Sequence, residues 1–191
     1  TSTVYVLTYG AEGENAKDVI KVVQPIEIAF ENSERAYGEE NPTFTYVTER
    51  PDLLVGIPVG VTEATTTSGI GDYTITLDPT SISNSMVTVT DATLTVNKAK
   101  LTITADDIEV HQDEEMPVLT WKAEGWKNDE DESVLTVQPV CTTEGTPDSP
   151  LGDYTITISG AEAANYDITY VNGKLTVSVP VGITSIDANV A

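Results

Sequence analysis

Few side chains of this chain could carry out chemistry, and those few are scattered. Among the 191 residues there is one histidine, His111, and one cysteine, Cys141. A histidine base needs a partner in a pocket, and one cysteine can form neither an internal disulfide nor a thiolate zinc site. We interpret His111 as a surface residue and Cys141 as a small buried apolar residue of a strand. Because no nucleophile, metal set or phosphate loop can be assembled, the sequence predicts a protein that is not an enzyme and has no cofactor.

Carboxylates are abundant, and they raise the question of calcium. The run Asp129–Glu132 lacks the turn glycine and the spaced aspartates of a calcium loop, so we interpret it as a solvated acidic loop. Asp106 and Asp107 lie near the expected boundary between two modules, where calcium could stiffen a tandem array. The sequence leaves calcium binding at that boundary open.

The two tryptophans are the candidate ligand-binding residues. Trp121 aligns with Tyr46 of an internal repeat, and both are expected to pack in a core or hold a loop. Trp126 follows Gly125 and has no aromatic counterpart in the repeat. An exposed tryptophan can stack on a sugar ring, so Trp126 with nearby Trp121 would form a platform for a glycan. The alternative is that Trp126 covers its own loop or a module interface.

The charge of the chain excludes several partners. Nine basic residues face 31 acidic ones, which gives a net charge of −22 and an isoelectric point near 4.1. Nucleic-acid binding depends on cations against phosphates, and an anionic membrane surface would repel the chain for the same reason. The charge also favours solubility, so we expect a monomer without nucleic-acid or membrane partners.

An internal repeat is the most informative feature. Residues 71–96 align with residues 152–177 at an offset of 81, with 11 identities in 26 positions. The preceding halves align at an offset of 75, which places six extra residues of the second copy between Trp121 and Pro150. Such periodicity is the signature of repeated structural units. We therefore expect one module over residues 24–98 and a second over residues 99–179.

Each copy has the pattern of β-strands. Apolar residues alternate with threonines, as in residues 73–77 and 154–158, which predicts strands with one buried face. Asn172-Gly173 predicts a two-residue hairpin, and residues 129–135 predict one turn of helix, with a weaker counterpart at residues 51–54. The predicted fold is all-β: two tandem small modules, sandwiches or β-grasp-like sheets, without long helices.

The ends of the chain differ from the repeats. Residues 1–23 match neither copy, and they are expected to form an N-terminal hairpin or the tail of an upstream domain. Residues 180–191 lack alternation, and we expect a C-terminal linker. The connection over residues 96–101 has neither glycine nor proline, so a strand is expected to run through it and to make the pair a fairly stiff rod.

The repeated motifs resemble a known family. Residues 36–46 (AYGEENPTFTY) are similar to the opening of the MBG-type (YGX) repeat module, and residues 101–107 resemble the start of such a module. Residues 149–156 and 164–177 resemble its second half. The copies depart from the pattern in two places: the second has Gln112-Asp113 in place of Tyr-Gly, and the first has Ser85 in place of the Tyr of Asn-Tyr.

The resemblance implies a function that the residues alone do not supply. Such modules recur in tandem in large bacterial secreted and surface proteins, many of them adhesins. Residues 181–188 (VGITSIDA) resemble the junction before a C-terminal sorting segment in Bacteroidetes surface proteins. The expected function is therefore a non-catalytic spacer or stalk, extracellular or on the surface of a Gram-negative, Bacteroidetes-like bacterium, with a surface glycan or protein as the partner. The alternative is a carbohydrate-binding module that uses Trp126.

Overall fold

The computed structural model describes residues 25–84 and 86–180, and the expectations for residues 1–23 and for most of 180–191 lie outside this range. The described residues form short strands and two single turns of 3-10 helix. In the first repeat these are β1 (Ile26–Phe30), β2 (Ser33–Ala36), β3 (Tyr46–Val47), η1 (Pro51–Leu53), β4 (Gly60–Val61), β5 (Gly71–Leu77), β6 (Val87–Thr90) and β7 (Ala92–Asn97). In the second they are β8 (Ala99–Ala105), β9 (Ile108–His111), β10 (Trp121–Glu124), η2 (Glu132–Val134), β11 (Val140–Thr143), β12 (Gly152–Ser159), β13 (Tyr166–Val171) and β14 (Gly173–Ser178).

The apolar residues that alternate with threonines in the sequence are the buried residues of the strands. In β8, Leu101, Ile103 and Ala105 are buried, and the threonines between them are half-buried. In β12, Ile156 and Ile158 point into the core, whereas Thr155 and Thr157 are exposed. β-branched threonines suit the outer face of a pleated sheet. The two helical turns also lie where the sequence predicts them, and Asp131 caps the second by accepting a hydrogen bond from the Ser133 amide.

The chain divides into two compact units. Among the described residues, unit 1 comprises residues 25–35, 39–65 and 71–96. Unit 2 comprises residues from 97 onward together with two short segments, 36–38 and 66–70. Unit 2 therefore includes a few residues that belong to the first repeat by sequence.

Unit 1 contains two small sheets around one core. Their strand orders are β3-β1-β6 and β2-β7-β5-β4. Ile28 of β1, Ile75 of β5 and Leu94 of β7 are fully buried in the same cluster, so both sheets contribute to it. Phe44 and Tyr46 pack against the cluster, and the rings of Phe30 and Tyr46 meet edge to face with centroids 6.2 Å apart.

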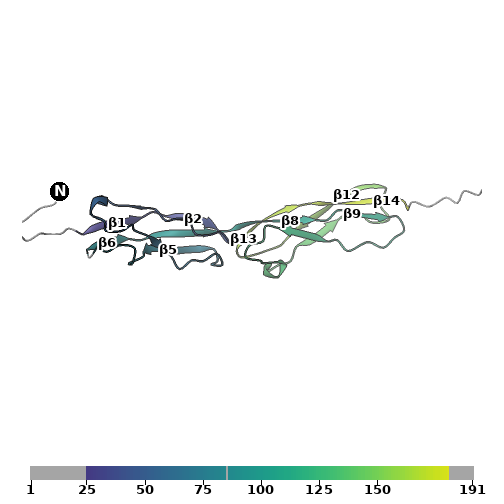
Figure 1. Ribbon diagram of the computed structural model, residues 1–191. Helices are drawn as coiled ribbons and strands as arrows, with labels where there is room; N and C mark the ends of the chain where they lie inside the picture. The colour runs from purple at the N-terminus through teal and green to yellow at the C-terminus, as the bar shows by residue number, and fades with distance from the viewer. Residues whose placement is uncertain (1–24, 85, 181–191) are drawn as a thin grey trace, which may run out of the picture. The chain divides into compact units, whose positions relative to one another are not determined.

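Unit 2 repeats this topology strand for strand. Its sheets have the orders β10-β8-β13 and β11-β12-β14-β9. β8 pairs in parallel with β13 and antiparallel with β10, as β1 does with β6 and β3. Leu101, Ile103, Ile156 and Leu175 are fully buried in this unit. Figure 1 shows β8 continuing into β9 and β13 into β14 along the unit.

The expected hairpin at Asn172-Gly173 is wrong. β13 and β14 lie in different sheets, and the two residues connect them in a crossover. Gly173 has no positive φ, which a type I′ turn would need. Gly173 is small for another reason, because a Cβ at this position would lie 2.6 Å from the Ala105 carbonyl oxygen. Ala105 ends β8, at the point where the segment from β8 to β9 also crosses between the sheets.

The fold is thus all-β, in two modules whose sheets form half-barrels. Each module contains one three-stranded and one four-stranded sheet, and over the described residues no helix exceeds one turn. Across residues 25–84 and 86–180, no helix has the length and apolar character needed to span a membrane.

Candidate functional site

The two tryptophans occupy different settings. Trp121 begins β10, where it pairs with Ala105 of β8, and it is half-buried. Trp126 is also half-buried, and its ring forms a T-shaped pair with that of Tyr166, with centroids 5.4 Å apart and planes at 83°. The ring of the proposed sugar platform is therefore already in contact with a buried tyrosine.

Trp126 belongs to a cluster that we call the Glu130 cluster: Tyr37, Trp126, Glu130 and Tyr166, all in unit 2. The hydroxyl of Tyr37 donates to Glu130 Oε1 at 2.6 Å, and the hydroxyl of Tyr166 donates to Glu130 Oε2. The Tyr166 oxygen also accepts the Lys127 amide at 2.9 Å. The two tyrosine rings meet edge to face at 5.8 Å. Tyr37 is 3% exposed and Tyr166 2% exposed, so their hydroxyls depend on this carboxylate.

The carboxylate and burial both favour protonated tyrosines. The hydrogen bond to Glu130, followed by burial, raises the pKa of Tyr37 above its ordinary value of 10.0. For Tyr166 burial is the larger cause and the bond to Glu130 the second, and its pKa lies well above the ordinary value. Because a phenolate beside a carboxylate would be repelled, the two tyrosines stay protonated and donate to Glu130.

The members of the Glu130 cluster sit where the two copies differ. Tyr37 aligns with Gln112, and Tyr166 aligns with Ser85. Glu130 and Trp126 lie in the stretch that contains the six extra residues. Sequence reasoning singled out Trp126 and missed its partners. The positions where the two copies differ could have pointed to these residues, but the sequence does not show that they contact one another.

The Tyr-Gly turn has the same backbone shape in both copies despite the different residues. Gly38 has φ +80°, and the aligned Asp113 has φ +67°. Aspartate tolerates this left-handed region better than most residues. The departure at Gln112-Asp113 therefore keeps the turn and removes the tyrosine.

Within unit 1 the family motif holds a buried charge. Arg35 is 5% exposed, its Nε donates to Asn41 Oδ1 at 2.8 Å, and a terminal nitrogen donates to the Thr65 carbonyl at 2.5 Å. Asn41 in turn donates to the Ala64 carbonyl at 2.7 Å. Asn41 of the motif thus connects β2 to the segment that precedes β5, and buried polar groups need such partners.

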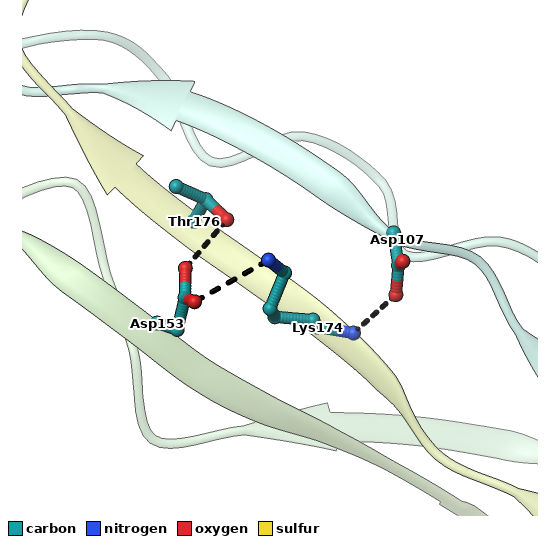
Figure 2. Close-up of polar contacts among 4 residues, drawn as sticks. All are labelled: Asp107, Asp153, Lys174 and Thr176. Atoms are coloured by element: carbon teal, nitrogen blue, oxygen red, sulfur yellow. Dashed lines mark hydrogen bonds and ion pairs between the residues drawn. The ribbon is translucent and has the colours of Figure 1, made fainter.

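A polar tie recurs on the outer face of both modules. In unit 2, Thr176 of β14 donates to Asp153 of β12 at 2.8 Å, and in unit 1 Thr95 of β7 donates to Asp72 of β5 at the same distance. Figure 2 shows Lys174 between two aspartates: its Nζ lies 3.3 Å from Asp153 Oδ2, and its backbone amide donates to Asp107 at 2.8 Å. The Thr176 bond and then Lys174 lower the pKa of Asp153 below its ordinary value.

Asp106 and Asp107 each accept a hydrogen bond within unit 2. Both lie inside unit 2, in the crossover between β8 and β9. Asp106 accepts the Thr120 hydroxyl at 2.8 Å, and Asp107 accepts the Lys174 amide. Glu31 and Asn32 do the same in unit 1, where they accept the Thr45 hydroxyl and the Thr93 amide. Within residues 25–84 and 86–180, no three His, Cys, Asp or Glu side chains are grouped to hold a metal ion.

The histidine and the cysteine have ordinary surroundings. His111 ends β9, half-buried, and its Nδ1 lies 2.6 Å from the Ser178 hydroxyl. Cys141 lies in β11 as the sequence predicts, but it is half-buried and not fully buried, because β11 is an edge strand. Burial, with the charge of Asp106, raises the pKa of the Cys141 thiol, so it is a poor nucleophile.

Grooves occur on both units. A polar groove of about 530 Å³ in unit 2 is lined by residues that include Lys98, Glu162, Asp167 and Tyr170. An apolar groove of about 470 Å³ in unit 1 is lined by residues that include Phe44, Ile57, Val59 and Val61. Neither brings together a base and a nucleophile in the pattern of an active site.

The fold and these ties define a class of protein: consecutive copies of one small two-sheet β-module, each closed by its own polar contacts. The YGX-type MBG domain profile matches residues 26–95 and again residues 101–176. The chain therefore belongs to the MBG domain family (YGX type), whose modules are typical of surface proteins. No curated protein matches the chain.

Proposed function

We propose that this chain is a non-catalytic spacer or stalk segment of a bacterial protein that is secreted or displayed on the cell surface. The observation that carries the proposal is the repetition of one module, with the same strand order and the same polar ties in both copies. What the copies share is what holds the fold together. Repetition of a self-contained unit adds length to a chain without adding a new site.

The charge supports the same proposal. A net charge of −22 disfavours association between copies of the chain at high local density on a surface. The partner of the parent protein, a surface glycan or another protein, would then be bound by a distal domain. This segment would hold that domain away from the cell, extracellularly, in a Gram-negative organism of the Bacteroidetes type.

A display experiment tests the spacer function. The complete chain is placed between a surface anchor and a reporter binding domain, and compared with the same reporter joined directly to the anchor. We expect capture of bead-bound ligand to rise with the insert, while the Kd for soluble ligand stays unchanged. Equal capture by the two proteins would contradict the proposal.

The alternative is carbohydrate binding in unit 2, and one observation favours it. Half-buried Trp126 contacts Tyr166, and Tyr166 also lines the polar groove together with Tyr170. A glycan array probed with the wild-type chain, Trp126→Ala and Tyr170→Ala decides between the two. If the wild-type chain binds a glycan and either variant loses that binding, the chain acts as a carbohydrate-binding module and not as a spacer. Absence of binding in all three agrees with the spacer.

A further inference from the structure

The first arm of the second module (β8 and β9) and its last arm (β13 and β14) are parallel and paired on both sides of a crossover. β8 pairs with β13 at six positions, from Ala99 opposite Tyr166 to Thr104 opposite Val171. β9 pairs with β14 at four positions, from Ile108 opposite Leu175 to His111 opposite Ser178. Both arms change sheet together between these two pairings. The partners are 67 residues apart in both pairings, so the register is not interrupted at the crossover.

Side-chain contacts secure this ladder at its beginning, middle and end. Lys100 forms an ion pair with Asp167 near the beginning. Asp107 accepts the Lys174 amide at 2.8 Å at the crossover, and His111 lies 2.6 Å from the Ser178 hydroxyl at the end. Each pair spans the same 67 residues.

The first module has the corresponding parts. β1 pairs in parallel with β6 from Ile26 opposite Val87 to Ala29 opposite Thr90, and β2 lies beside β7. At the crossover, Asn32 accepts the Thr93 amide at 2.9 Å, as Asp107 accepts that of Lys174. Asparagine and aspartate offer the same carbonyl-type oxygen for this bond.

From this geometry we infer that each module is a load-bearing unit, in which tension along the chain is carried by the parallel ladder in shear. Tension on the chain pulls the beginning of β8 toward the N-terminal side and the end of β14 toward the C-terminal side. Because the two arms are parallel and paired on both sides of the crossover, this tension makes them slide past each other, which strains many hydrogen bonds at once. In an antiparallel hairpin pulled at its open end, the bonds would break one after another.

The inference rests on the proposed spacer function for its biological meaning, since a stalk transmits force from a bound ligand to the cell. Resistance to force is set by the unfolding rate and not by the equilibrium free energy of unfolding. A small module can therefore hold under load without being unusually stable. The property belongs to the topology, so it is measured on the chain by itself.

Single-molecule force spectroscopy in two pulling directions tests the inference. In the first, the complete chain is pulled by its two termini, which loads both ladders in shear. In the second, handles are attached at Lys100→Cys and Asp167→Cys in a Cys141→Ser background, which opens the ladder of the second module from one end. The exposed ion pair lost by these changes contributes little to stability.

We expect the second module to unfold at severalfold higher force in the terminal direction than in the opening direction. Equal forces in the two directions would overturn the inference. Asp107→Ala should lower the terminal unfolding force of the second module, with the first module as the internal reference. Asp107→Asn should leave that force unchanged, because Asn32 makes the same bond in the first module. An unchanged unfolding force in Asp107→Ala would show that the hydrogen bond between Asp107 and the Lys174 amide does not bear the load.

The outcomes separate the inference from the proposed function. Glycan binding with high terminal force would overturn the spacer and leave the load-bearing ladder standing. Increased reach in the display experiment with equal forces in the two directions would support a spacer and overturn the ladder.

Discussion

Tyr37 donates a hydrogen bond of 2.6 Å to Glu130, although 93 residues separate the two in the chain. Tyr166 donates to the other oxygen of the same carboxylate. None of the three residues has a counterpart of the same type in the other copy of the repeat. The cluster is thus specific to one place in the repeat and is not part of what the two modules share.

The raised pKa values of the cluster predict alkaline sensitivity. A tyrosine whose folded pKa lies above its unfolded value of 10.0 stabilises the fold fully below pH 10, and that contribution is lost as the pH rises further. We expect the melting temperature of unit 2 to fall as the pH rises above 10. The melting temperature of Tyr166→Phe should fall less steeply with rising pH than that of the wild-type chain. Tyr154→Phe is the control, because its hydroxyl donates to the Pro150 carbonyl outside the cluster.

Removing the shared acceptor should destabilise unit 2. Glu130→Ala leaves two buried tyrosine hydroxyls without their partner, and each such loss costs about 1–3 kcal/mol. Urea unfolding measures the change in free energy. Glu132→Ala in the same acidic run is exposed and should stay within about 0.5 kcal/mol of wild type. Equal effects of the two substitutions would contradict a structural role for Glu130.

The core of the second module depends on β8. Leu101→Ala deletes a fully buried side chain of the central strand and should cost about 2–5 kcal/mol. Val118→Ala, at a position 82% exposed, should change the free energy of unfolding by less than about 0.5 kcal/mol. Differential scanning calorimetry follows both variants. A Leu101→Ala melting curve that coincides with wild type would refute this assignment of the core.

A glycine is required where β12 begins. Gly152 has φ +148°, as Gly71 has +147° at the same place in the first module, and side chains other than glycine rarely adopt this region. There is open space around Gly152, so the cost of Gly152→Ala is backbone strain alone, about 1–3 kcal/mol. Thr155→Ala on the exposed face of the same strand is the control, and chemical denaturation compares the two. A neutral Gly152→Ala would show that the turn can rearrange.

Much of the fold could be predicted from local pattern. The alternation of apolar residues and threonines identifies β5, β8, β12 and β14, because a strand turns successive side chains to opposite faces. The family followed from motifs such as residues 36–46, and the profile match at residues 26–95 and 101–176 confirms it. The sequence pattern could not tell which strands are neighbours, so the hairpin expected at Asn172-Gly173 was wrong.

The candidate site was less predictable. Trp126 stood out as an unmatched aromatic residue, but its contact with Tyr166 and the convergence of Tyr37 on Glu130 depend on distant segments meeting. Asp106 and Asp107 follow β8 in the sequence, but only the structure shows that they accept hydrogen bonds from Thr120 and Lys174 at a crossover. Spacing along the chain carries no information about such meetings.

The sequence by itself determined the all-β class, the duplication of the module and the strongly acidic charge, because these depend on composition, period and local alternation. Only the tertiary structure decided that β8 and β9 pair in parallel with β13 and β14, and that both arms cross between sheets at Asp107 and Gly173. The physical reason is that strand pairing is chosen by burial of the inner faces of the two sheets in one core. An alternating strand fits many partners until that core selects one.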